Sequence, residues 1–204
     1  MVAGLFKTRA YSKRHYAFVM AFAIVLGGIM FFFLSGKEGV TSAENEGAQI
    51  IESPYIRSAP TRLEIPAIKL DTTFVPPLGL LPDKTVSVPD SYIKVGWYSG
   101  GSTPGENGPA VILGHVDSKE GPAVFYSLGQ LKEGDEIKIT RDDGTRVTFI
   151  VTKLQRYPQV NFPTQEVYGM TDSPTLRLVT CTGTFDRGVQ KYSHNLVVYA
   201  SLIE

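Results

Sequence analysis

The sequence predicts an all-β domain, closed or nearly closed into a barrel, that follows a membrane-spanning N-terminus. Between residues 61 and 204 the apolar residues occur in short alternating or β-branched runs, which are typical of strands rather than of long helices. Pro, Gly and Asp-Gly separate these runs. There are eight of them, and closure into a barrel leaves no strand edge exposed.

The predicted membrane span lies near the N-terminus. Residues 16–34 are 19 consecutive residues without a charge, enough as a helix to cross about 30 Å of hydrocarbon. Residues 1–15 carry four basic and no acidic side chains, whereas Glu38, Glu44 and Glu46 follow the span against a single Lys37. We therefore expect residues 1–15 in the cytoplasm and the chain after the span outside. A cleaved signal peptide is the alternative, but its apolar core is usually only about 7–15 residues long.

Residues 35–60 are rich in Gly, Ser, Glu, Asn and Pro, and we expect a flexible extracellular linker. Residues 61–204 have the usual size of one domain. Of the 20 Lys and Arg, 16 follow the span, against 20 acidic residues, so the exported part is acidic overall. No basic patch indicates a nucleic-acid partner.

Within the domain, Asp143-Gly144 predicts a hairpin, because both residues tolerate the positive φ of a type I′ turn. Residues 123–131 are the one segment with helical spacing of apolar side chains, so a short helix is expected there. The eight predicted strands are 62–68, 71–75, 95–97, 110–115, 136–140, 146–156, 175–181 and 196–202.

Cys181 is the only cysteine, and it ends the apolar run of residues 176–181. An exported lone thiol has no intramolecular disulfide partner, so it is an incidental buried residue, an intermolecular crosslink or a reactive group. The thiolate is the nucleophile, and a thiol needs a neighbouring base or cation to form it at neutral pH.

His115 ends another predicted strand, directly after Gly114, where the backbone can approach a neighbour closely. It could remove the thiol proton and later protonate a departing amine. A histidine hydrogen-bonded at the barrel rim is the simpler alternative. His194, in a predicted turn before the last strand, competes for the same role.

An attacked carbonyl also needs a group that stabilises its oxyanion. Arg187 is the only arginine after Cys181, in the loop that follows it, where it could fold back over the thiol or be a solvated charge. One cysteine and two exported histidines match no common zinc spacing, so neither a metal nor another cofactor is expected.

The connection of residues 157–174 is long enough to form the wall of a peptide groove, and loops of this length are uncommon unless functional. It contains Phe162, Tyr168 and Met170, which we expect to bind substrate. The alternative is that these side chains cap the barrel.

These segments together resemble the sortases, and most closely the class F sortases. The resemblance covers residues 63–202 and rests on Val95-Gly-Trp-Tyr98, on Pro104 to Asp117 with His115, on Phe162-Pro-Thr164, and on Leu176-Arg-Leu-Val-Thr-Cys-Thr-Gly-Thr-Phe-Asp186. It implies an eight-stranded sortase-type β-barrel with one or two short helices.

The resemblance implies a membrane-anchored cysteine transpeptidase. Such an enzyme cleaves a C-terminal Leu-Pro-X-Thr-Gly (LPXTG) sorting signal between Thr and Gly, forms a thioester, and transfers the protein to an amine of a cell-wall precursor. By motif position Cys181 is the nucleophile, His115 the acid and base, and Thr180 lines the substrate groove. An arginine is implied for the oxyanion.

One position departs from the class F pattern, in which an arginine lies close before the final strand. Residues 192–195 contain none, so Arg187 is the candidate by elimination. The other possibility is that backbone amides hold the oxyanion, with His194 nearby.

Two other function classes are compatible with an exported cysteine. An exported cysteine hydrolase or an L,D-transpeptidase-like cell-wall enzyme is the first, although the latter expects a Ser/His-X-Gly-Cys motif and the chain has Leu-Val-Thr-Cys. A catalytically inert surface module is the second, and it predicts no reactive thiol.

Overall fold

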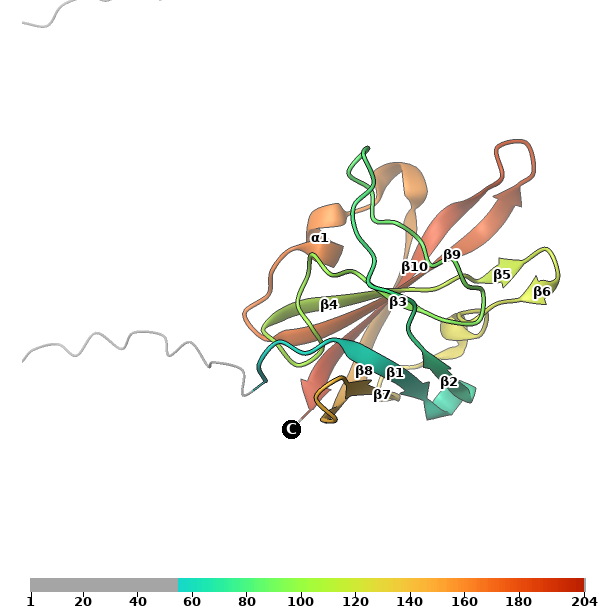
Figure 1. Ribbon diagram of the computed structural model, residues 1–204. Helices are drawn as coiled ribbons and strands as arrows, with labels where there is room; N and C mark the ends of the chain where they lie inside the picture. Colours follow the sequence, from blue (N-terminus) through green and yellow to red (C-terminus); the bar gives the residue numbers. More distant parts are fainter. Residues whose placement is uncertain (1–54, 204) are drawn as a thin grey trace, which may run out of the picture. The chain divides into compact units, whose positions relative to one another are not determined.

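The computed structural model describes residues 55–203, which form a curled eight-stranded sheet and a separate two-stranded hairpin (Figure 1). The strand order is β2-β1-β7-β8-β10-β9-β4-β3, and all neighbours are antiparallel except β4 and β9. The strands are β1 (Pro60–Ile65), β2 (Leu70–Thr73), β3 (Gly96–Trp97), β4 (Gly108–Leu113), β5 (Asp117–Ser118), β6 (Gly121–Pro122), β7 (Glu136–Arg141), β8 (Arg146–Pro158), β9 (Pro174–Asp186) and β10 (Lys191–Ile203).

The two edges of the large sheet meet, so the sheet curls back on itself. Val75 N–H donates to Val95 O at 2.8 Å, and Val95 N–H donates to Thr73 O at 3.2 Å. These bonds join the end of β2 to the start of β3. The predicted eight-stranded β architecture is therefore confirmed.

Side chains alternate between the inside of the curl and its outer face, as strand geometry requires. The inner core includes Leu63, Ile112 and Phe149, all fully buried. A second apolar cluster lies on the outer face of β4, β9 and β10. It consists of Val111, Val167, Val179, Val197 and Tyr199.

All eight predicted strands are present, but β9 and β10 are longer than expected. They pair as one hairpin that projects beyond the rest of the sheet (Figure 1). The Asp143-Gly144 hairpin is also found, between β7 and β8. Its turn is not type I′, because only Gly144 has a positive φ, of 80°.

The predicted helix of residues 123–131 was wrong. This segment forms turns and one 3₁₀ helix, Leu128–Gln130. Its first backbone N–H groups bond to the preceding loop instead of within a helix: Ala123 N–H donates to Val116 O, and Phe125 N–H donates to His115 O. The α-helix α1 (Thr164–Tyr168) lies instead in the β8–β9 connection, which also holds the 3₁₀ helix Gln159–Asn161.

The predicted cytoplasmic segment of residues 1–15 and the predicted span of residues 16–34 lie outside the described residues. Among residues 55–203, no helix has both the length and the apolar composition needed to cross a membrane. Residues 55–60 of the predicted linker pack on the barrel, since Arg57 donates to Ser99 O at 2.9 Å and lies over the Trp97 ring. Arg57 thus contacts the folded domain.

Candidate active site

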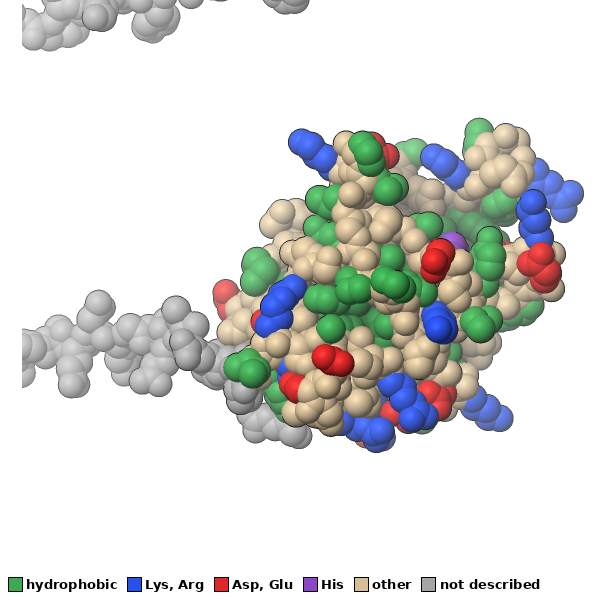
Figure 2. Space-filling model, in the orientation of Figure 1, with side chains coloured by type: hydrophobic (Ala, Val, Ile, Leu, Met, Phe, Trp, Pro, Cys, Tyr) green, Lys and Arg blue, Asp and Glu red, His purple; other side chains and the backbone are tan. Residues whose placement is uncertain are grey.

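A cavity of about 790 Å³ opens on the outer face of the sheet, above β4, β9 and β10. The β2–β3 connection forms one wall, and the β8–β9 connection forms the other. Figure 2 shows hydrophobic side chains exposed across the face over which the β2–β3 connection runs, and that connection exposes Leu80, Leu81 and Val88. Residues on these elements, among them Cys181 and His115, line the cavity.

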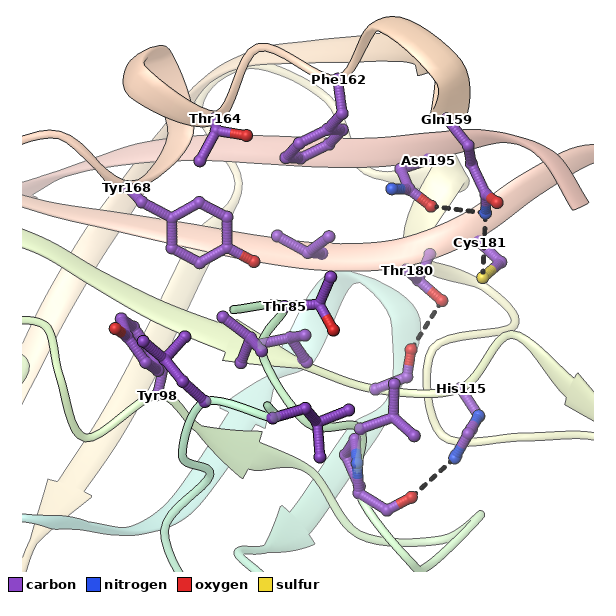
Figure 3. Close-up of a pocket in the computed structure, with 18 of the residues that line it drawn as sticks. Thr85, Tyr98, His115, Gln159, Phe162, Thr164, Tyr168, Thr180, Cys181 and Asn195 are labelled. Carbon is purple, nitrogen blue, oxygen red and sulfur yellow. Dashed lines mark hydrogen bonds between the residues drawn. The ribbon is translucent and has the colours of Figure 1, made fainter. Parts of the chain in front are cut away.

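Cys181 lies within β9, on the same outer face as Val179, and its side chain is partly exposed. The Gln159 Nε2 amide donates toward Sγ at 3.8 Å (Figure 3). Asn195 faces Cys181 across the β9–β10 ladder. The sulfur therefore reaches the cavity beside two carboxamide side chains.

His115 lies two residues after the end of β4, and hydrogen bonds hold the backbone at Gly114 and at His115 itself. Gly114 N–H donates to Val179 O at 3.1 Å, and Phe125 N–H donates to His115 O at 2.9 Å. The His115 ring Nε2 lies 2.8 Å from Pro89 O. A carbonyl oxygen only accepts, so Nε2 carries the hydrogen and Nδ1 of the neutral ring is left as the basic nitrogen.

Figure 3 shows Cys181 and His115 at the same end of the cavity. Their strands are neighbours, because β4 runs parallel to β9. No hydrogen bond joins the thiol and the imidazole in the described residues. The arrangement thus brings a thiol and an imidazole to one cavity from segments 66 positions apart in the chain.

Burial raises the pKa of the Cys181 thiol above its ordinary value, and the nearby charge of Asp117 raises it further. The bond from Gln159 acts in the opposite direction. Asp117 also accepts a hydrogen bond from the Tyr192 hydroxyl, which raises the pKa of Tyr192 to about 12. On balance, these surroundings favour the neutral thiol over the thiolate.

Three of the four predicted substrate-binding residues line the cavity. Phe162 and Tyr168 form part of the β8–β9 wall, where Tyr168 contacts Tyr98 edge to face with ring centroids 5.8 Å apart. Thr180 also lines it, and its buried hydroxyl donates to Gly114 O at 2.8 Å. Met170 does not line the cavity and is 73% exposed.

Arg187 does not lie at the thiol in this structure. The continuation of β9 to Asp186 places Arg187 in the turn at the tip of the β9–β10 hairpin, exposed to solvent. Arg187 follows Cys181 by six positions, which in an extended strand correspond to about 20 Å. His194 is not among the residues that line the cavity, and its Nδ1 lies 2.8 Å from the Ser193 hydroxyl.

A family model of the sortase domain matches residues 63–203. The chain belongs to the sortase family. Its members are cysteine transpeptidases that attach proteins to the cell wall. No curated protein sequence gives a significant match.

Solved sortase structures share the fold. The chain is similar to a lid mutant of sortase A from Corynebacterium diphtheriae (22% identity, 74% of this chain and 73% of that one, TM-score 0.54). Sortase A from the same organism gives 22% identity over 74% and 63% of the two chains (TM-score 0.55). Sortase C-1 from Actinomyces oris gives 23% identity over 70% and 71% (TM-score 0.53).

Sequence reasoning missed several residues at the site of this sortase. The wall formed by the β2–β3 connection gave no signal, because its apolar side chains lie in a segment without strand or helix periodicity. Gln159 and Asn195 were missed because only the fold of the β8–β9 connection and the register of β10 on β9 bring them to the thiol.

Proposed function

We propose that this chain is a sortase of class F type, held in the cell membrane by residues 16–34 with its catalytic domain outside the cell. In this proposal it cleaves an LPXTG-type sorting signal between Thr and Gly and transfers the protein to an amine of a cell-wall precursor. The observation that carries the proposal is the single thiol of Cys181 in one cavity with the imidazole of His115.

The proposed reaction begins when His115 Nδ1 removes the thiol proton as sulfur attacks the Thr carbonyl carbon. A carbon–sulfur bond forms and an electron pair moves onto the carbonyl oxygen. When this pair returns, the bond to the Gly nitrogen breaks, and the imidazolium protonates the departing amine. The acceptor amine then attacks the thioester and releases the thiol.

The groove supports an extended peptide as the substrate. Its floor is the outer face of β4 and β9, and its walls carry Leu80, Phe162 and Tyr168. Leu and Pro side chains of a sorting signal would bury apolar area here, which contributes about 25 cal/mol per Å². The cavity lies within the usual size range of ligand sites, roughly 300–1,000 Å³.

Mass spectrometry of the full chain in mild detergent, with a sorting-signal peptide library and candidate amines, tests this function. The acyl adduct on Cys181, the preferred motif and the preferred acceptor are all read from it. We expect Cys181→Ala to abolish cleavage with an unchanged circular dichroism spectrum. Undiminished cleavage by that variant would remove the mechanism.

A histidine pair provides the matched test of the base. We expect His115→Ala to lower kcat by about 10²–10⁴-fold, the usual contribution of general acid–base catalysis. His194→Ala removes the same side chain from outside the cavity and should remain within about threefold of the wild type. The reverse outcome assigns the base to His194.

A further inference from the structure

We infer that the carboxamides of Gln159 and Asn195 form the oxyanion site of this enzyme, in place of an arginine. The inference rests on the proposed acyl transfer at Cys181. It concerns the carbonyl oxygen that gains negative charge when sulfur attacks.

Both amides are placed beside the sulfur by the fold. Asn195 pairs with Cys181 in the antiparallel ladder, and such facing residues have Cβ atoms about 4.5–5.5 Å apart. Gln159 begins the 3₁₀ helix directly after β8. Its Nε2 lies 3.8 Å from Cys181 Sγ and 3.0 Å from Asn195 Oδ1 (Figure 3).

The bond between the two amides fixes which atoms face the substrate. Asn195 Oδ1 accepts from Gln159, so Asn195 Nδ2 is left as a donor, and among residues 55–203 it has no hydrogen-bond partner. Gln159 Nε2 has a second hydrogen, directed toward the sulfur. The pair therefore presents two N–H groups to the cavity.

The distances suit an oxyanion. In an attack geometry the carbonyl carbon lies about 3–3.5 Å from the nucleophile, and its oxygen is about 1.2 Å from that carbon. The Gln159 Nε2 donor, 3.8 Å from the sulfur, can then reach that oxygen, and Asn195 lies beside it, bonded to the same amide. Preorganised N–H donors of this kind stabilise the tetrahedral intermediate without needing a cation.

Three cations are the competing candidates among the described residues. Arg187 lies at the exposed hairpin tip. Lys191, at the start of β10, and Lys84, in the β2–β3 connection, line the cavity and are both exposed. The charged side chain that influences the thiol is Asp117, an anion. Within residues 55–203, none of the three cations is among the groups that influence the pKa of the Cys181 thiol.

The test compares two reactions of the same sulfur in the full 204-residue chain. Acylation, measured with a sorting-signal peptide and separately with p-nitrophenyl acetate, passes through an oxyanion. Alkylation by iodoacetamide at its high-pH limiting rate does not, because the attacked carbon is saturated. A residue that only supports the fold would affect both reactions.

We expect Asn195→Ala and Gln159→Ala each to lower the acylation rate by about 10²-fold or more, as loss of one oxyanion donor does. The limiting alkylation rate should stay within about threefold. Asn161→Ala and Gln155→Ala are the matched controls, since both remove exposed carboxamides outside the cavity. Asn195→Asp, a variant of equal size, should show the same loss of acylation.

Three outcomes overturn the inference. The first is acylation within threefold of wild type in Asn195→Ala and Gln159→Ala. The second is an equal loss of acylation and alkylation. The third is a hundredfold loss in Arg187→Ala or Lys191→Ala while Asn195→Ala is unaffected.

The two substrates separate this inference from the proposed function. A wild-type chain that reacts with the ester and with no sorting-signal peptide contradicts the proposed substrate, while the ester still tests the amides. A wild-type chain that neither substrate acylates overturns both.

Discussion

The thiol of Cys181 differs from an activated cysteine paired with a cation. Its environment disfavours negative charge, because burial and Asp117 both raise the pKa of the thiol. Only the Gln159 amide favours the thiolate. In the proposed mechanism, proton removal by His115 therefore accompanies the attack on substrate rather than preceding it in the resting enzyme.

This predicts the pH dependence of thiol alkylation. Since the thiolate is the reactive form, the rate of Cys181 alkylation by iodoacetamide should rise with pH to a midpoint above about 8.5, the ordinary thiol value. Asp117→Asn removes a negative charge and should lower that midpoint. Asp172→Asn, at an exposed position, should not. A wild-type midpoint below pH 8 contradicts the prediction.

At the level of single residues, the sequence pointed to Cys181 and His115 because each carries chemistry that few other side chains of the domain could supply, and both line one cavity in the structure. The carboxamides proposed for the oxyanion could not be found in the same way. Choosing Arg187 assumed a short loop after Cys181, whereas continued strand pairing carries Arg187 to the hairpin tip. Asn195 becomes a candidate only once the register of β10 is known.

Side-chain hydrogen bonds attach the β8–β9 wall of the groove to the sheet. Glu166, in α1, accepts hydrogen bonds from the hydroxyls of Tyr157 on β8 and Tyr199 on β10, at 2.6 and 3.2 Å. These bonds, led by that of Tyr157, lower the pKa of Glu166. They attach the short helix, and with it the wall that carries Phe162 and Tyr168, to the sheet.

We predict that Glu166→Gln loosens this wall. The KM for a sorting-signal peptide should rise several-fold at pH 7, and the urea midpoint should fall. A carboxyl group whose folded pKa is depressed stabilises the fold above its unfolded value of about 4.3 and loses this effect as pH falls through the folded value. The difference in urea midpoint should therefore shrink below about pH 4.

Glu133→Gln is the matched control, because Glu133 is exposed in the turn before β7. It should leave both KM and the urea midpoint unchanged. A Glu166→Gln variant whose difference from wild type grows on acidification would contradict the assigned role of the carboxylate.

At the scale of elements, the strand predictions succeeded where apolar and polar residues alternate along the chain. Strands β7 to β10 show this alternation clearly, because one face of each strand packs in the core. The helix prediction for residues 123–131 failed because Phe125, Leu128 and Leu131 are buried by successive turns that bond to the preceding loop. Strands β5 and β6, of two residues each, are too short to leave a pattern.

At the scale of the whole molecule, the barrel core positions His115. Gly114 lies where three parts of the chain meet: its N–H donates to Val179 O, its carbonyl accepts from the Thr180 hydroxyl, and Phe125 packs on its Cα. Closure at residues 73–75 and 95, which no local pattern indicated, completes the core into which Phe125 fits. The position of His115 therefore depends on packing inside the barrel.

Gly114→Ala tests this dependence. A Cβ at position 114 would lie 2.5 Å from Phe125 Cδ2, so the ring or the strand end must shift. We expect a loss of about 1–3 kcal/mol in the free energy of unfolding, as overpacking costs. We also expect kcat/KM to fall by more than tenfold, because small misplacements of reacting groups are costly.

Two further variants separate packing from other effects of the substitution. Gly129→Ala adds the same methyl group at ordinary contact distance, 3.6 Å from Leu196, and should change kcat/KM by less than twofold. Gly114→Ala combined with Phe125→Leu frees space at the strand end, so part of the lost kcat/KM should return even though the smaller side chain lowers stability. If the double variant is no more active than Gly114→Ala alone, packing against Phe125 is not what places His115.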